Sequence, residues 1–273
     1  MVDMHSDRPT HPDSPAIGEG WSWENRPRFS VSRGARAILL RLEHKPLLQD
    51  LTQELLSIIR ESVGRRRMAK LPEWREAERS TAEFVERSMK HALRFDNRWA
   101  LLDFALRESP PYGDLLEFGV FKGSSLRFIA AAVDSRARVF GFDSFLGLPE
   151  TWRQGGAVTP RESFRLKRVP KPPKGTVLLV GWFEDTIPKF VLDVNPSPVF
   201  LHVDSDLYTS ARTILTLMGH LIRPGAVIVF DEFFGFPGWE EGEAKALWEA
   251  ADRFGWKLRY LGFFRDKIVV LVT

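Results

Sequence analysis

The sequence predicts an α/β fold with a mostly parallel sheet, an antiparallel last strand and a helical N-terminal extension. From residue 114 onward, short apolar runs alternate with helical patterns, which is typical of parallel strands joined by right-handed helical crossovers. Two adjacent apolar runs, 256–264 and 266–273, leave no room for a helix between them and indicate a closing hairpin. Residues 33–64 and 73–107 carry apolar side chains at helical spacing instead.

The N-terminal part of the chain is expected to lie outside the sheet. Residues 1–32 contain several prolines and little periodicity, so we expect a flexible arm. Residues 33–111 are expected to form a helical extension that covers a site or builds a homodimer, ending near Pro110, Pro111 and Gly113. Residues 112–273 are expected to form the main domain.

Within that domain, each element follows from a short apolar segment and its flanking turn. A long loop is expected at 146–175, between the second and third strands. The expected strands before the hairpin are 114–120, 137–145, 176–183, 198–206 and 225–233, and the clearest helices are 124–134, 209–221 and 241–254.

The composition excludes several classes of protein. Lys and Arg outnumber Asp and Glu by only 39 to 36, which gives no dense basic stripe for nucleic acid. The chain has no cysteine, so thiolate nucleophiles, disulfides and zinc–thiolate sites are excluded, and we expect a cytoplasmic protein. No apolar run approaches the ~20 residues that a membrane span needs.

Acidic residues follow the ends of the predicted strands. Ligands of open parallel sheets bind outside the carboxyl ends of the strands, so these acids are expected on one rim. Clustered carboxylates repel one another and need donors or a cation. The acids are Glu117, Asp143, Glu184, Asp185, Asp204, Asp206, Asp231 and Glu232.

The turn after the first predicted strand reads LLEFGVFKGSS, and its two glycines are four residues apart. This spacing lacks the G-x-G-x-x-G pattern of dinucleotide sites and the P-loop pattern. The acid Glu117 suits a positively charged group better than pyrophosphate. These features favour S-adenosylmethionine, with its amino group at Glu117 and its carboxylate at Ser124 and Ser125.

The next strand ends carry residues suited to the adenosine half of that cofactor. Asp143 can accept hydrogen bonds from both ribose hydroxyls, and Trp182-Phe183 can stack on the adenine ring. The complete set of expected cofactor-binding residues is Glu117, Phe118, Gly119, Gly123, Ser124, Ser125, Asp143, Ser144, Trp182, Phe183 and Asp204.

Carboxylates at the tips of the fourth and fifth strands suit a hard cation. Asp204, Asp231 and Glu232 offer the oxygen ligands that Mg²⁺ prefers. Candidates for the group that removes a proton from an acceptor hydroxyl are Asp204, Asp206 and His202. His202 lies two residues before Asp204 and shares its face of the strand, where a buried, hydrogen-bonded histidine is the competing interpretation.

Six segments in order resemble the macrocin O-methyltransferase (TylF-type) family of class I S-adenosylmethionine-dependent methyltransferases. They are LLEFGVFKGSS, FGFDSFLGLPE, VGWFEDTIP, FLHVDSDLY, RPGAVIVFDEF and FPGWEEGEAKA, and the resemblance covers about residues 112–273. It implies a Rossmann-like sheet of seven strands, the last antiparallel. It also implies Mg²⁺-dependent methylation of a hydroxyl on a small molecule, often a sugar of a natural product.

Carried onto this sequence, the resemblance assigns the metal to Asp204, Asp231 and Glu232 and the ribose to Asp143. Glu232 stands where some members have Asp. Catechol O-methyltransferase, a more distant relative, has a lysine base at the position of Leu207, so that base is missing here.

Three alternatives to this function remain open from the sequence. They are a metal-free methyltransferase, an NAD(P)-dependent oxidoreductase and a non-catalytic binding protein on the same fold. The identity of the methyl acceptor is not readable from the sequence.

Overall fold

The structure is a computed structural model of the chain and describes residues 71–133, 137–154 and 157–273. The arm expected at 1–32 and the helix expected at 33–64 lie outside these residues. Within the described ranges, no helix has the length and apolar character that crossing a membrane requires.

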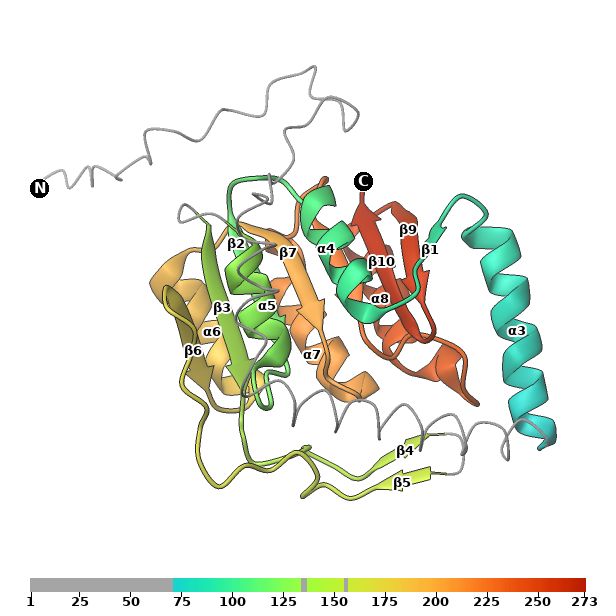
Figure 1. The fold of residues 1–273 in the computed structure, drawn as a ribbon, viewed down its shortest axis with the longest axis horizontal. Coiled ribbons are helices and arrows are strands. Elements are labelled where there is room, and N and C mark those ends of the chain that lie inside the picture. Colours follow the sequence, from blue (N-terminus) through green and yellow to red (C-terminus); the bar gives the residue numbers. More distant parts are fainter. Residues whose placement is uncertain (1–70, 134–136, 155–156) are drawn as a thin grey trace, which may run out of the picture.

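The core of the fold is an eight-stranded sheet with the strand order β1-β9-β10-β8-β7-β2-β3-β6 (Figure 1). Strand β10 runs antiparallel to both of its neighbours, β8 and β9, and the other pairs are parallel, which confirms the expected antiparallel last strand. The strands are β1 (Leu93–Arg94), β2 (Asp114–Phe118), β3 (Arg138–Asp143), β6 (Thr176–Val180), β7 (Pro198–Val203), β8 (Val227–Phe230), β9 (Leu258–Phe264) and β10 (Lys267–Val272).

The strand β1 is the main difference from the sequence prediction. The helical stretch expected at 73–107 is two helices, α3 (Pro72–Ser88) and α4 (Arg98–Glu108), separated by this strand. Strand β1 pairs in parallel with β9 and adds an eighth strand to the seven expected. Two residues are too few to show an alternating pattern. Asn97 marks the new boundary, because its side chain accepts a hydrogen bond from the Ala100 N–H at 2.8 Å.

The loop expected at 146–175 also contains regular structure. Strands β4 (Trp152–Gln154) and β5 (Ala157–Thr159) form a separate two-stranded antiparallel sheet. In Figure 1 this hairpin extends away from the main sheet, below the ends of the strands. The segment expected as a long loop therefore also contains two short strands.

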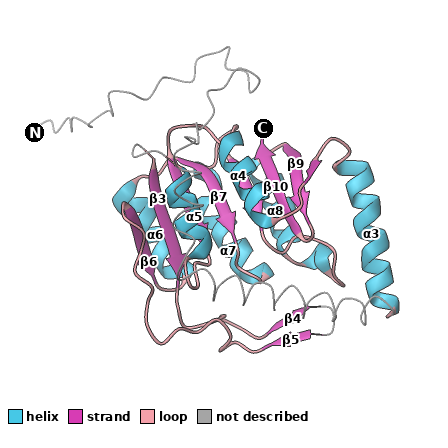
Figure 2. Ribbon diagram, viewed as in Figure 1, coloured by secondary structure: helices cyan, strands magenta, loops and turns pink. Residues whose placement is uncertain are grey.

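Helices cover both faces of the sheet (Figure 2). Helices α4 and α5 (Ser124–Ala132) lie on one face, and α6 (Phe183–Val194), α7 (Tyr208–Met218) and α8 (Glu243–Phe254) on the other. Helix α3 stands beside the β9 edge, where Phe84 packs on Phe233, Trp239 and Tyr260 with ring centroids 6.0, 5.4 and 5.3 Å away. The apolar core is therefore divided into two layers by the sheet.

The register of the central strands brings three strand ends level. Phe118 of β2 lies opposite Val203 of β7, which lies opposite Phe230 of β8. Hydrogen bonds continue this pairing beyond the strands, because the Asp204 N–H donates to Phe118 O at 2.9 Å and the Asp231 N–H donates to Val203 O at 3.0 Å. The residues that follow these strands therefore share one rim.

Candidate active site

A cavity of about 750 Å³ opens at the carboxyl ends of the parallel strands. This volume is in the range of small-molecule and cofactor sites. Most of the residues expected at the site line it: Gly119, Asp143, Ser144, Trp182, Phe183, Asp204, Asp206, Asp231 and Glu232. The strand-end acids of β3, β7 and β8 are thus brought to one cavity, as the sequence predicted.

The glycine turn approaches the end of β7 so closely that a side chain does not fit. Gly119 has a φ of 94°, and a Cβ built there would lie 1.8 Å from the carbonyl oxygen of Asp204. Gly123 has a φ of 76° and precedes α5 as its N-cap. The first glycine therefore permits contact between the turn and the acid-bearing end of β7.

Asp143 holds the same turn from the neighbouring strand. Its Oδ2 accepts hydrogen bonds from the N–H groups of Val120 and Phe121 at 2.9 and 2.7 Å, and its Oδ1 accepts one from the Phe145 N–H at 2.7 Å. A carboxylate has about four acceptor positions, so it can still accept from a ligand hydroxyl. Asp143 therefore both shapes the turn and faces the cavity.

Three carboxyl groups gather on the wall formed by the ends of β7 and β8. Ligand atoms of Asp204, Asp206 and Glu232 all lie within 4.8 Å of one another. Burial, followed by the nearby charge of Asp231, raises the pKa of all three, that of Asp206 to about 7. The buried Glu232 Oε2 has no hydrogen-bond partner among the described residues. A cation would relieve both the repulsion and this unpaired oxygen, so the residues fit a metal site.

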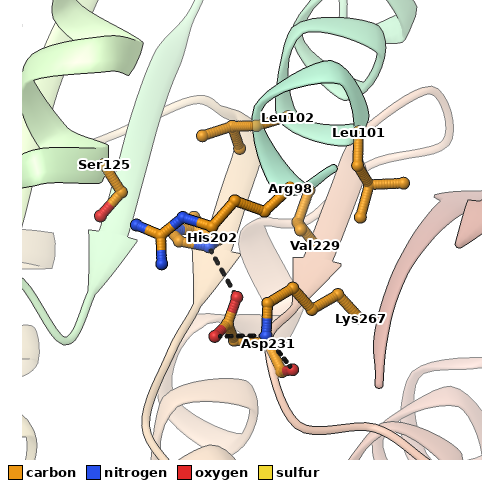
Figure 3. Close-up of a pocket in the computed structure, with 8 residues that line it drawn as sticks. All are labelled: Arg98, Leu101, Leu102, Ser125, His202, Val229, Asp231 and Lys267. Atoms are coloured by element: carbon orange, nitrogen blue, oxygen red, sulfur yellow. Dashed lines mark hydrogen bonds and ion pairs between the residues drawn. The ribbon is translucent and has the colours of Figure 1, made fainter. Parts of the chain in front are cut away.

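Asp231 differs from its acidic neighbours because a lysine neutralises it. Lys267 Nζ lies 2.9 Å from Asp231 Oδ2 and also donates to the Asp231 carbonyl oxygen at 3.2 Å (Figure 3). Although burial acts in the opposite direction, Lys267 and His202 hold the pKa of Asp231 well below its usual range. Asp231 also groups with Asp204 and His202, so the expected trio of metal ligands is split over two overlapping clusters that share Asp204.

The structure corrects the expected roles of Glu117 and His202. Both side chains are buried, and His202 Nδ1 lies 2.9 Å from Glu117 Oε1, while its Nε2 faces Asp231 Oδ1 at 3.9 Å. Burial by itself lowers the pKa of His202, but Asp231 and Glu117 outweigh it and raise this pKa to about 10. A buried ring that is held between two carboxylates and lies outside the large cavity is unsuited to be a general base.

Glu117 likewise does not line the cavity, so its expected contact with a cofactor amino group is not supported. Its side chain is fully buried on β2, where the register sets it opposite His202. The acid in the sequence motif therefore serves a buried ion pair.

Four other expected cofactor residues lie beside the large cavity without lining it. The Phe118 side chain stacks on Phe142 in the core, with ring centroids 4.7 Å apart. Ser124 Oγ accepts a hydrogen bond from Arg127 at 3.3 Å. Ser125 lines a small cavity of about 10 Å³ together with Arg98, which reaches from α4 toward it (Figure 3). Gly123 acts through the start of α5.

Several residues at the site were not expected from the sequence. Arg98 lines both cavities. It lies on α4, and no sequence motif indicates that this helix is close to the site. Lys267 begins the last strand, and only the position of β10 beside β8 brings it to Asp231. Phe121, Trp152 and Phe164 add aromatic surface to the large cavity.

Comparisons with known proteins agree with this fold. The family model described as a methyltransferase domain matches residues 116–233, from within β2 to just beyond β8. No curated protein matches the chain. The chain therefore has an α/β Rossmann-like methyltransferase fold, and the match supports a methyltransferase.

Solved structures similar to this chain include three methyltransferases. The O-methyltransferase NovP is 21% identical, with 64% of this chain and 79% of NovP covered and a TM-score of 0.49. The calicheamicin methyltransferase CalS11 is 19% identical, with 94% of this chain and 98% of CalS11 covered and a TM-score of 0.47. MycE of the mycinamycin pathway, solved with Mg and SAH, is 16% identical, with 59% of this chain and 45% of MycE covered and a TM-score of 0.39.

Proposed function

We propose that this protein is an S-adenosylmethionine-dependent, Mg²⁺-dependent O-methyltransferase of the macrocin O-methyltransferase (TylF) type. Its acceptor would be a hydroxyl of a small molecule, such as a natural-product sugar. The observation that carries the proposal is the continuity of one cavity from Asp143 and Trp182 to the acid cluster of Asp204, Asp206 and Glu232. A cavity that can hold the cofactor at one end and a cation at the other suits methyl transfer to a hydroxyl oxygen activated by the cation.

The cofactor half of the cavity fits the nucleoside. S-adenosylmethionine supplies an electrophilic methyl group when bound. Asp143 would accept hydrogen bonds from the ribose hydroxyls, and Trp182 and Phe183 would flank the adenine. The methionine end of the cofactor would lie toward Gly119 and the cation Arg98, which line the same cavity.

The other half of the cavity fits a cation and an acceptor hydroxyl. Mg²⁺ bound there supplies positive charge that lowers the pKa of the acceptor. Asp204 would be the central ligand because it belongs to both clusters of possible ligand atoms. Glu232 would be a second ligand, with Asp206 or Asp231 completing the set.

Among the candidates for general base, Asp206 lines the cavity beside the possible metal ligands. Without a metal, burial and the charge of Asp231 raise its pKa to about 7, and a bound cation would lower this pKa, so Asp206 would be ionised at neutral pH. Its backbone φ of 62° is unusual for a residue with a side chain and is compatible with a functional position. Asp204 stays the second candidate, and His202 would instead orient Asp231.

Calorimetric titration of S-adenosylhomocysteine, with and without Mg²⁺, tests this function directly. We expect binding in both conditions and divalent-ion binding that is lost in Asp204→Ala. Glu249→Gln, an exposed change on α8, serves as the control. Full activity of Asp204→Ala and Asp231→Ala on an identified acceptor would refute the metal model.

Other measurements distinguish the proposed function from the three alternatives. Methyl transfer that survives complete chelation by EDTA would favour a metal-free methyltransferase. Thermal stabilisation by NADH and not by S-adenosylhomocysteine would favour an oxidoreductase. The absence of any nucleoside binding would favour a non-catalytic protein. Homodimer formation through residues 33–111 and a cytoplasmic location stay predictions, which sedimentation and cell fractionation would test.

A further inference from the structure

Glu243 is a buried acid behind the acid cluster, and it does not line the large cavity. It is the first residue of α8 and is fully buried. It lies in FPGWEEGEAKA, the last of the six segments that resemble the macrocin O-methyltransferase family. The proposed mechanism does not use its side chain.

The two oxygens of Glu243 bind two different loops. Oε1 accepts hydrogen bonds from Ser205, from the N–H at 3.4 Å and from Oγ at 3.2 Å. Oε2 accepts one from the Glu232 N–H at 3.2 Å. Ser205 lies between Asp204 and Asp206 after β7, and Glu232 follows β8. One side chain therefore joins the two loops that carry the cluster.

A buried carboxylate at position 243 is energetically unfavourable unless its two oxygens are needed as hydrogen-bond acceptors for the neighbouring loops. Burial, together with the charges of Asp204, Asp206 and Asp231, raises the pKa of Glu243, although the hydrogen bond from Glu232 opposes this. An apolar residue at this position would avoid that cost but would leave the N–H groups of both loops without acceptors. Glutamine has the same shape, yet it offers one acceptor oxygen in place of two.

We propose that Glu243 is a positioning residue that fixes the distance between the β7 loop, with Asp204 and Asp206, and the β8 loop, with Glu232. This inference rests on the proposed function, since the cluster is taken to hold the divalent cation. Second-layer hydrogen bonds of this kind orient metal ligands, and their removal commonly weakens metal binding by about 10- to 100-fold.

The test compares Glu243→Gln with Glu249→Gln, the same substitution at an exposed position of α8. Mn²⁺ binding, followed by electron paramagnetic resonance, is expected to weaken at least about tenfold in Glu243→Gln only. Affinity for S-adenosylhomocysteine without metal and the thermal midpoint are expected to stay near wild type. Amide hydrogen exchange at Ser205 and Glu232 is expected to become faster.

Each outcome decides the inference. Wild-type Mn²⁺ affinity in folded Glu243→Gln would overturn it. If the wild-type protein binds no Mn²⁺, the metal part of the proposed function fails, and the exchange measurement still decides whether Glu243 joins the loops. If Glu243→Gln does not fold, Ser205→Ala removes one of the bonds and is expected to weaken Mn²⁺ binding a few-fold. Unchanged Mn²⁺ affinity and exchange in that variant would then contradict the inference.

Discussion

Replacing Gly119 by alanine tests the close approach between the glycine turn and the end of β7. The added Cβ would lie 1.8 Å from the Asp204 carbonyl oxygen, whereas ordinary contacts begin at 3.4 Å. The two backbones must therefore separate by more than an ångström. Asp204 lines the cavity and shares both clusters of possible ligand atoms, so the displacement reaches the site itself.

The expected loss of stability has two parts. A left-handed backbone costs about 1–2 kcal/mol for a residue with a Cβ, and overpacking adds about 1–3 kcal/mol. The total of about 2–5 kcal/mol corresponds to a fall of roughly 5–15 °C in the thermal midpoint for a chain of this size. We also expect affinity for S-adenosylhomocysteine to fall at least about tenfold, because misplacement by an ångström is costly in a binding site.

Gly175→Ala provides the matched control. Gly175 has a φ of 78°, and nothing lies within 4 Å of a Cβ built there, so only the backbone cost applies. Scanning calorimetry and ligand titration on both variants separate the cost of the left-handed backbone from the cost of the steric contact with Asp204. Equal midpoints for the two variants, with unchanged ligand affinity in Gly119→Ala, would refute the reasoning.

Three further predictions follow from the charged groups of the site. Lys267→Met is expected to destabilise the metal-free protein by about 3 kcal/mol, because Asp231 loses its 2.9 Å partner, and Mg²⁺ should restore part of the loss in thermal melts. Asp143→Asn is expected to weaken S-adenosylhomocysteine binding about tenfold, because a single acceptor oxygen must then serve both the turn and the ribose. Calorimetric titration that gives the wild-type affinity for this variant would contradict the prediction. The metal-free protein is expected to lose stability progressively from about pH 4 to about pH 10 in urea titrations, because the folded-state pKa values of Asp206 and His202, about 7 and about 10, exceed their unfolded values of about 4 and about 6.5. Such groups stabilise fully below the unfolded pKa and lose that contribution as the pH rises through the folded one, so stability that increases over this range would contradict the assignment.

The rim of acids was predictable because it depends on local pattern. Once 198–206 and 225–233 are assigned as strands, Asp204 and Asp231 must follow their carboxyl ends, and adjacent parallel strands bring those ends together. The spacing of the two glycines and the acid Glu117 also argue that the turn at Gly119 does not bind pyrophosphate. These conclusions need no knowledge of side-chain partners.

The partners of these residues were not predictable because they depend on strand order and register. Glu117 meets His202 only because β2 and β7 pair in one register, and a shift by one residue would turn it to the other face. Lys267 reaches Asp231 only because β10 inserts between β8 and β9. The short strand at Leu93 has too little sequence pattern to be recognised, so its pairing with β9 was also missed.

The pairing of β1 with β9 also determines when the edge of the sheet can form during synthesis. Leu93 pairs with Gly262, and Phe84 of α3 packs on Tyr260, so both contacts join an early segment to one of the last to be translated. At ~5–20 residues per second, the ribosome takes roughly ten to thirty seconds to make the intervening chain. Helix α3 and strand β1 must therefore leave the ribosome without their partners and dock after the last strands emerge.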